Sequence, residues 1–249
     1  MRSNLKRWLN AFGVDVRLTR NIARAEARRK VEEWRRPWQA LRDLCPVRTI
    51  IDAGANDGQF AAMIHGVFPD APILSFEPLP ECQEPLRRVL RDMPGSKAFQ
   101  IALGAEPGAG LFRRTSFSPC SSMLRPNDRL KAEVEHLTET STLEVPFARL
   151  DDVLEPLHPV PPLLIKLDVQ GYEKEVLAGA PKTLAAASIV VLEVAFVPLY
   201  ENQPLFDDLY PMLRDCGFCY RGNLAQIVSR LDGVITEADA LFMRQPLCK

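Results

Sequence analysis

The sequence predicts an α/β fold: a mostly parallel, doubly wound sheet with helices on both faces. Three observations predict it. The chain has 249 residues, of which 47% are hydrophobic and 25% charged, which is an ordinary globular balance. From residue 47 onward, short apolar runs alternate with segments of helical periodicity. A glycine-rich turn joins the first of these runs to the first helical segment, as in folds built from right-handed β-α-β crossovers.

The expected elements follow this alternation in order. Runs rich in Val, Ile and Leu between Gly and Pro breakers are typical of buried strands. These strands are expected over 48–52, 72–77, 99–103, 163–168 and 189–194, with closing strands at 218–220, 226–229 and 240–243. The segments between them carry apolar residues at helical spacing. The corresponding helices are expected over 59–67, 80–93, 172–186 and 205–216.

Residues 104–147 interrupt the alternation. Gly and Pro punctuate 104–110, and the rest is expected to form a strand at 111–115, a short helix at 127–137 and a strand at 143–147. Long insertions into compact domains are commonly lids or binding loops. We therefore interpret 104–147 as a substrate-side insertion within a domain that covers 46–249.

Residues 1–45 are predicted to be a basic, helical N-terminal extension. Residues 1–36 hold 11 Lys or Arg and 4 Asp or Glu, a net charge of +7, so the remainder carries −8 of the total of −1. Such a leader suits an anionic membrane surface, another subunit, including a second copy of the chain, or simply a solvated helical face. The total charge gives no reason to expect nucleic acid as a partner. No apolar run reaches the roughly 20 residues of a membrane span, and no secretory signal is visible, so a cytoplasmic protein is expected, with the inner membrane surface as a peripheral site.

The six cysteines are dispersed, unlike those of a disulfide scaffold. Cys216 and Cys219 form a C-x-x-C, but a zinc ribbon needs a second such pair. Because Gly217 reads as a helix stop before a strand, we expect reduced, structural thiols.

The turn at residues 52–58 has the features of a nucleoside-binding loop. Gly54 and Gly58 allow a tight turn and a close ligand approach, and the helix start offers free N–H groups. Three residues separate these glycines, so neither the dinucleotide nor the phosphate-loop pattern is met. The next strand ends at Glu77, where an acidic residue binds the two hydroxyls of a ribose in such folds.

These motifs resemble the FkbM family of S-adenosylmethionine (SAM) methyltransferases. The resemblance covers about 49–196 and is carried by the turn at 52–58, Phe76-Glu77-Pro78, the block at 165–173 and Leu192-Glu193-Val194. It implies a class I, Rossmann-like methyltransferase fold, SAM as cofactor and O-methylation, often of a sugar hydroxyl or a secondary metabolite. It also implies a Ser-Ser-Leu-like element in the insertion, matched by Ser121-Ser122-Met123. The residues expected to bind the cofactor are Asp52, Gly54, Asn56, Gly58, Glu77, Pro78, Ala102 and Ser122.

Acidic residues at strand ends are the candidates for the acceptor side. A neutral hydroxyl needs a base, or a metal that makes it acidic. Asp168 ends one strand and Glu193 lies near the end of the next, where they could hold Mg²⁺; alternatively Asp168 acts as a base without metal. Glu173 is expected to assist, and His136 of the insertion to reach the acceptor. The structural alternatives are Asp168 as a helix cap, Glu173 as a residue favouring a helix start, and Glu193 paired with Lys166.

The functional hypothesis is methyl transfer from SAM to a hydroxyl of a glycan or small metabolite. Two rivals stay open: a methyltransferase for a protein or amine, and a SAM-binding module of a glycan-assembly complex without turnover. The sequence does not identify the acceptor position or the oligomeric state.

Overall fold

The computed structural model describes residues 36–245. The chain forms two compact units, one ending at Asp43 and one beginning at Leu44. Residues 36–44 are helical. The predicted contacts of the basic leader, residues 1–36, fall almost wholly outside the described residues, so they stay predictions.

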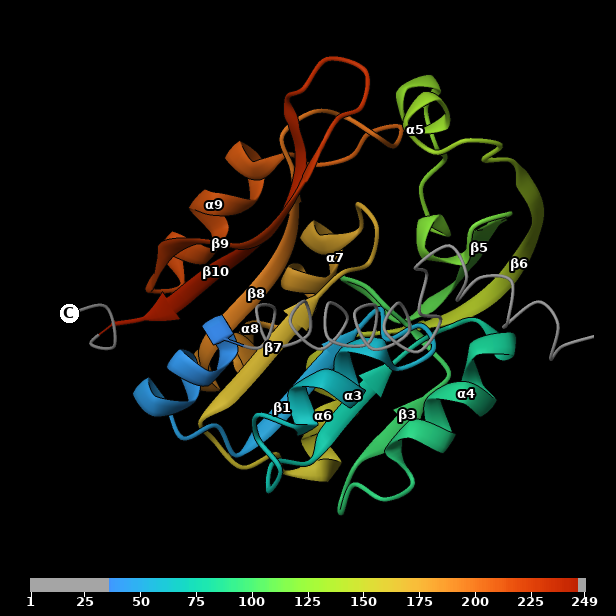
Figure 1. Ribbon diagram of the computed structural model, residues 1–249. Coiled ribbons are helices and arrows are strands. Elements are labelled where there is room, and N and C mark those ends of the chain that lie inside the picture. Colours follow the sequence, from blue (N-terminus) through green and yellow to red (C-terminus); the bar gives the residue numbers. More distant parts are fainter. Residues whose placement is uncertain (1–35, 246–249) are drawn as a thin grey trace, which may run out of the picture. The chain divides into compact units, whose positions relative to one another are not determined.

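The second unit is built on a seven-stranded sheet with the order β3-β2-β1-β7-β8-β10-β9 (Figure 1). All neighbouring pairs from β3 to β8 are parallel, and β10 runs antiparallel to both β8 and β9. The predicted doubly wound, mostly parallel fold is therefore confirmed. The strands are β1 (Thr49–Ala53), β2 (Ile73–Phe76), β3 (Lys97–Phe99), β7 (Leu163–Leu167), β8 (Ala187–Ala195), β9 (Phe218–Val228) and β10 (Ile235–Arg244).

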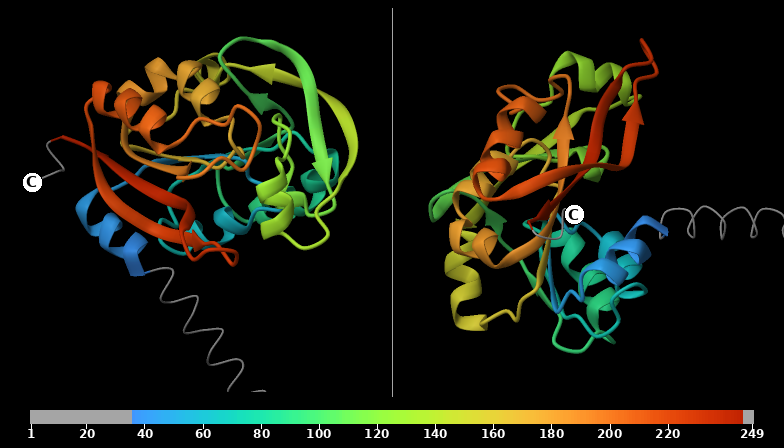
Figure 2. Two further views of the ribbon diagram at one scale, coloured as in Figure 1. Left: turned by 90° about the horizontal axis from the view of Figure 1, so that it is seen from above. Right: turned by 90° about the vertical axis from the view of Figure 1, so that its left-hand side faces the viewer.

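The strand order reverses between β1 and β7, and this reversal distributes the helices. From β1 the sheet grows toward β3, and from β7 it grows the other way, so right-handed crossovers place their helices on opposite faces. Figures 1 and 2 show the two helical layers. One holds α3 (Gln59–His65) and α4 (Pro80–Leu90); the other holds α7 (Glu173–Ala178), α8 (Pro181–Ala186) and α9 (Phe206–Asp215). Ligands of such sheets bind at the carboxyl ends of the strands beside the reversal.

The core lies between these layers. Every residue of β1, β2 and β7 is buried, as expected for parallel strands covered on both faces. Before β7, the chain forms α6 (Leu150–Leu154) and the short 3₁₀ helix η2 (Glu155–Leu157).

The insertion contributes a second sheet of three strands in the order β4-β6-β5. Its strand, helix and strand occur in the predicted order. Asn127 starts the helix because its side-chain oxygen accepts the N–H of Leu130 at 3.0 Å. The elements are β4 (Ala102–Leu103), β5 (Gly108–Thr115), the 3₁₀ helix η1 (Ser118–Cys120), α5 (Asp128–Glu133) and β6 (Glu139–Ala148).

Four predicted elements were wrong in detail. The strand expected at 99–103 is two strands, because the chain leaves the main sheet after Phe99 and β4 pairs with β6 instead. The helix expected at 172–186 is divided into α7 and α8, since Pro181 lacks an N–H and disfavours helical backbone in the residue before it. The strands expected at 218–220 and 226–229 form the single strand β9, whose pairing with β10 shifts register at several points.

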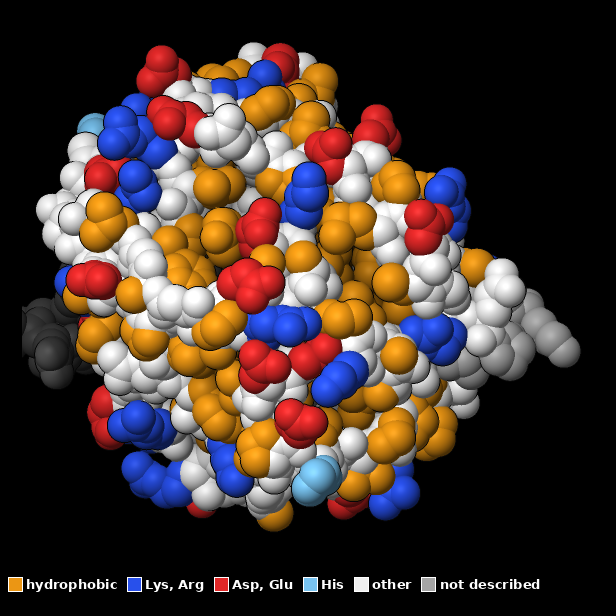
Figure 3. Space-filling model, turned by 180° about the vertical axis from the view of Figure 1, so that it is seen from behind, with side chains coloured by type: hydrophobic (Ala, Val, Ile, Leu, Met, Phe, Trp, Pro, Cys, Tyr) orange, Lys and Arg blue, Asp and Glu red, His pale blue; other side chains and the backbone are white. Residues whose placement is uncertain are grey.

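The C-x-x-C lies where a helix passes into a strand, as predicted. Cys216 follows α9, Gly217 adopts a φ of 87°, and Cys219 belongs to β9. The five cysteines between residues 36 and 245 are free thiols. No helix in that part of the chain is long and apolar enough to cross a membrane. Seen from behind, acidic and basic side chains are interspersed with hydrophobic ones (Figure 3).

Candidate functional site

The glycine loop is fastened to the end of β2. Its Gly54 and Ala55 N–H groups both donate to the carbonyl of Phe76, each at 3.0 Å. The N–H of Asn56 donates to Glu77 Oε2 at 3.0 Å. Gly54 and Glu77, which we predicted would share one site, are therefore neighbours.

Gly54 also brings this loop against the end of β7. It has a φ of 82°, and a Cβ built on it would lie 1.8 Å from the carbonyl oxygen of Asp168. No side chain fits in that space. The loop and Asp168 thus meet at the reversal of strand order because position 54 carries no side chain.

Glu77 is held in one orientation. Its side chain is buried, and Oε1 accepts the N–H of Leu79 at 2.8 Å while Oε2 accepts that of Asn56. Its carbonyl accepts the side-chain amide of Gln83 at 2.6 Å. Burial raises the pKa of Glu77 to about 7, against the lowering effect of the two backbone hydrogen bonds. Each carboxylate oxygen keeps a second lone pair, which a ligand hydroxyl can use.

Asp52 lies beneath the loop and is fully buried. Ser75 Oγ donates to Oδ2 at 3.4 Å, whereas Oδ1 has no hydrogen-bond partner among the described residues. Burial raises the pKa of Asp52 to about 6, opposed by the nearby Lys166 ammonium. An unpartnered buried carboxylate oxygen beside Glu77 fits a donor-bearing cofactor such as SAM, because buried polar atoms are otherwise satisfied.

The other predicted cofactor residues divide between two places. Near the loop, the side-chain oxygen of Asn56 accepts a hydrogen bond from the Cys82 thiol at 3.4 Å. Gly58 has a φ of 87° at the start of α3, and Pro78 is buried next to Glu77. Ala102 lies instead in β4, opposite Phe147 of the small sheet. Ser122 is fully buried, and its hydroxyl donates to the carbonyl of Gln170 at 2.6 Å. Their roles in binding a cofactor stay predictions.

Asp168 follows β7 and is held by protein donors on both oxygens. Lys166 Nζ lies 2.7 Å from Oδ2, and Gln170 Nε2 donates to Oδ1 at 2.8 Å. Burial works against the charge of Asp168, but the Lys166 ammonium and these hydrogen bonds keep its pKa below the usual range. Burial likewise opposes the charge of Lys166, whose pKa is nevertheless raised by Asp168, Asp239 and Asp52. Both groups are therefore charged at neutral pH.

Glu193 of β8 joins Asp168 through a shared neighbour. Gln170 Nε2 donates to Glu193 Oε2 at 2.6 Å, so the alternative in which Glu193 pairs with Lys166 was wrong. Burial, followed by the charges of Asp168 and Glu237, raises the pKa of Glu193 well above its usual value. Glu237 comes from β10, and burial raises its pKa to about 7.

Comparison with known proteins identifies the family to which this chain belongs. The Methyltransferase FkbM domain matches residues 52–220. The chain belongs to this family. The family match therefore confirms the resemblance, and it spans the glycine loop, Glu77, Asp168 and Glu193.

Two relatives and one solved structure illustrate the similarity. Methyltransferase sdnD of Sordaria araneosa is 36% identical over 52% of this chain, and the matched region spans only 59% of that protein. The 2-O-methyltransferase NoeI of Sinorhizobium fredii is 28% identical over 64% of this chain and 68% of its own length. Fibrillarin of Aeropyrum pernix, solved with natively bound S-adenosyl-L-methionine, is 12% identical, with 79% of this chain and 66% of that chain covered and a TM-score of 0.43.

The two remaining residues predicted to be catalytic in this FkbM-family chain, Glu173 and His136, lie in different surroundings. Glu173 is buried, and its Oε1 accepts the N–H groups of Val169 at 3.0 Å and Gly171 at 3.2 Å, so it holds the turn after Asp168. Burial raises its pKa to about 7. His136 is exposed in the insertion, and among the described residues its hydrogen bond is made by its carbonyl, with Ser116 Oγ. The structure does not bring the His136 imidazole to Asp168; catalytic roles for both stay predictions.

The magnesium prediction finds no support. Within residues 36–245 no group of three or more His, Cys, Asp or Glu side chains is arranged to hold a metal ion. Asp168 and Glu193 accept hydrogen bonds from Lys166 and Gln170 instead.

Sequence reasoning missed Gln170, Tyr200 and Glu237 as parts of this site. Gln170 stands inside the quoted 165–173 block, so its position was a usable signal. Tyr200, whose hydroxyl donates to Gln170 Oε1 at 2.8 Å, lies in a loop with no motif. Glu237 approaches Glu193 only because β10 pairs with β8.

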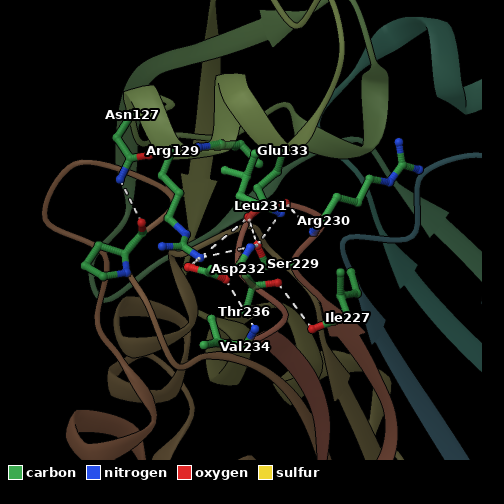
Figure 4. Close-up of polar contacts among 12 residues, drawn as sticks. Asn127, Arg129, Glu133, Ile227, Ser229, Arg230, Leu231, Asp232, Val234 and Thr236 are labelled. Carbon is green, nitrogen blue, oxygen red and sulfur yellow. Dashed lines mark hydrogen bonds and ion pairs between the residues drawn. The ribbon is translucent and has the colours of Figure 1, made fainter.

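A polar clasp joins the insertion to the turn between β9 and β10 (Figure 4). Arg129 of α5 lies 2.8 Å from Asp232 of the turn. Ser229 Oγ donates to Glu133 Oε1 at 2.6 Å and accepts the N–H of Leu231 at 3.0 Å. This clasp and the bond between Ser122 and Gln170 are two of the contacts that anchor the insertion, together with the backbone pairing of Arg125 and Asn127 with the loop before α9.

Proposed function

We propose that the protein transfers a methyl group from SAM to a hydroxyl of a glycan or small secondary metabolite. One observation carries the proposal: a single residue, Gly54, packs the glycine loop against Asp168 while the same loop is bonded to Glu77. A ribose-binding acid and an acceptor-side carboxylate thereby stand on either side of one turn. The family assignment supports methyl transfer as the chemistry.

The cofactor side is formed by the loop, Glu77 and Asp52. When bound, SAM supplies a methyl group on a positively charged sulfur, which is an already activated leaving group. Glu77 accepts hydrogen bonds from the ribose hydroxyls on its remaining lone pairs, and Asp52 Oδ1 accepts one donor. The surplus of carboxylates around Lys166 favours a cationic sulfur over a neutral one.

The acceptor side is formed by Asp168 and Glu193. Asp168 remains ionised and is partly exposed, with a side-chain exposure of 30%, so it can accept a hydrogen bond from an incoming hydroxyl. Asp168 would take up the proton of the acceptor hydroxyl when that oxygen receives the methyl group, and would release it to water. Positioning the hydroxyl and excluding water are the protein's other contributions.

A hydroxyl acceptor is favoured by the similarity to NoeI, named as a 2-O-methyltransferase. The insertion beside Asp168 provides the surface on which a sugar or metabolite would rest.

The test compares Asp168→Asn with the wild type in two measurements. Isothermal titration should give SAM dissociation constants within about threefold of each other, whereas methylation of a hydroxyl acceptor should fall by about 100-fold or more. Asp207→Asn, an exposed change on α9, is the matched control and should leave both unchanged. Retained activity in Asp168→Asn would remove Asp168 from the mechanism.

The acceptor panel should contain sugars, phenolic and aliphatic alcohols, amines and peptides. Methylation of amines alone would contradict the hydroxyl proposal in favour of N-methylation. SAM binding without turnover on any acceptor would favour a non-catalytic SAM-binding module. Loss of SAM binding with NADH binding in its place would overturn the cofactor assignment.

A further inference from the structure

We propose that Gln170 is a positioning residue for the acceptor side: its amide fixes Asp168 and Glu193 relative to each other and ties both to the insertion. The inference rests on the proposed function, since it explains how the two carboxylates are held for the acceptor. It concerns a residue that does not itself touch the reacting atoms.

All hydrogen-bonding groups of the Gln170 side chain are used. Nε2 donates to Asp168 Oδ1 at 2.8 Å and to Glu193 Oε2 at 2.6 Å, which accounts for both of its hydrogens. Oε1 accepts the hydroxyl of Tyr200 at 2.8 Å. The reverse orientation would aim the amide oxygen at the ionised carboxylate of Asp168. The surroundings therefore select one orientation of this amide.

The backbone of Gln170 is fixed as well. Its φ of 56° lies in the left-handed region, which a residue with a side chain adopts only when its surroundings hold it there. Its carbonyl accepts the hydroxyl of Ser122 at 2.6 Å, and Glu173 Oε1 accepts the N–H groups on either side of it. Ser122 also accepts the N–H of Leu124 at 3.0 Å. The turn is therefore fastened from the insertion and from α7.

Gln170 thus connects four separate parts of the fold. Asp168 follows β7, Glu193 belongs to β8, Ser122 to the insertion and Tyr200 to the loop before α9. The hydroxyl of Ser122 bonds to the backbone carbonyl of Gln170, so the insertion holds the backbone that carries this side-chain amide. Binding of an acceptor to the insertion is therefore coupled to the positions of the Asp168 and Glu193 carboxyl groups.

Two carboxylates bridged by one amide cannot both ionise readily, because like charges repel in a buried site. Lys166 bonds to Asp168 and keeps the anion there, so the proton of the pair resides on Glu193. The other titratable groups facing the pair come from β1, the turn, β10, the insertion and the loop before α9: Asp52, Glu173, Glu237, Asp239, Cys120 and Tyr200. The Glu193 carboxyl also hydrogen-bonds directly to Asp168, and the amide of Gln170 is the neutral donor that bonds to both groups.

Gln170→Glu is the most direct test, since it keeps the shape and the acceptor for Tyr200 but replaces the two donors by a third carboxylate oxygen. At pH 7.5 kcat should fall by about 100-fold while the SAM dissociation constant stays within about threefold. As the pH is lowered, activity should recover relative to wild type, because the introduced carboxyl becomes protonated and can donate again. Gln226→Glu adds the same charge on exposed β9 and should leave the pH profile unchanged. A uniform loss at every pH would indicate a merely structural role and overturn the proposal.

A second readout does not depend on turnover. Carboxyl ¹³C NMR, assigned with Asp168→Asn and Glu193→Gln, should show Asp168 ionised and Glu193 protonated at pH 7 in the wild type. In Gln170→Glu the titration of the pair should move upward by about one pH unit or more. Tyr200→Phe, which removes one hydroxyl and guards against misfolding of the first variant, should lower kcat by about 3- to 10-fold.

The two proposals fail separately. Identical carboxyl titrations in wild type and Gln170→Glu would overturn the role of Gln170 whether or not an acceptor is found. Altered titrations in a protein that methylates nothing would leave the role of Gln170 in place and contradict the proposed function.

Discussion

The two sides of the site are built differently. On the cofactor side, the loop at 52–58 and Glu77 belong to one β-α-β unit and are joined largely by backbone N–H groups donating to Phe76 and Glu77. On the acceptor side, Asp168, Gln170, Glu193 and Tyr200 are joined mainly by side chains from separate elements. The first arrangement depends on one β-α-β unit, and the second on the assembly of the whole domain. Changes should therefore act differently on the two sides.

Gly54→Ala should have the largest effect, because Gly54 is where the two sides touch. Its added methyl group would meet the Asp168 carbonyl at 1.8 Å, and its φ of 82° is unfavourable for alanine. We expect a loss of roughly 4 kcal/mol or more in the free energy of unfolding.

Chemical denaturation measures this loss. Gly108→Ala is the matched control: its Cβ would meet nothing within 4 Å, so stability should change by less than about 1 kcal/mol. Equal stability of the two variants would contradict the close contact between the loop and Asp168.

Glu173→Gln should change how the free energy of unfolding depends on pH. Burial raises the pKa of Glu173 to about 7, so the folded protein holds this proton more tightly than the unfolded chain does. The resulting stability is fully present below the unfolded pKa of about 4.3 and is lost as the pH rises through 7. Glutamine keeps an acceptor for Val169 and Gly171 and does not ionise.

The stability of Glu173→Gln relative to wild type should therefore rise by roughly 2–3 kcal/mol between pH 5 and pH 8. Urea denaturation at both pH values measures the difference. Glu201→Gln, at an exposed position, should show no such trend. A pH-independent difference for Glu173→Gln would mean that Glu173 is not the buried acid holding this turn.

Ser229→Ala tests whether the clasp anchors the insertion. The hydroxyl donates to Glu133 and accepts backbone N–H groups of the β9–β10 turn, and Ser229 is buried. Its removal should cost roughly 1–2 kcal/mol and speed hydrogen exchange of the amides of α5. Ser141→Ala, exposed on β6, serves as the control. Unchanged exchange in α5 would show that the clasp does not stabilise the insertion.

The smallest effect is expected at an exposed ion pair outside both sides. Lys182 and Glu155 lie 3.6 Å apart with side-chain exposures of 77% and 69%. Lys182→Met should change the free energy of unfolding by less than about 0.5 kcal/mol, because water screens such pairs. A larger change would mean that long-range electrostatics contribute more to this fold than the buried contacts suggest.

The sequence by itself determined the parallel sheet, the position of the insertion and the pairing of the glycine loop with Glu77. These features follow from local periodicity and from the spacing within one β-α-β unit, and both can be read along the chain. The sequence did not predict every element boundary. The chain leaves the main sheet after Phe99 because β4 pairs with β6, which lies about 40 residues further on.

Only the tertiary structure decided the partners of the acceptor-side carboxylates. That Lys166 bonds to Asp168, that Gln170 bridges to Glu193, and that Tyr200 and Ser122 hold Gln170 in turn all depend on strand register and on where the insertion folds back. Lys166 and Asp168 are near neighbours along the chain, but Glu193, Tyr200 and Ser122 lie 23, 30 and 48 positions from Gln170. Over such distances no local periodicity in the sequence signals a contact. For that reason the sequence predicted acidic residues on the acceptor side, but it did not predict their hydrogen-bond partners.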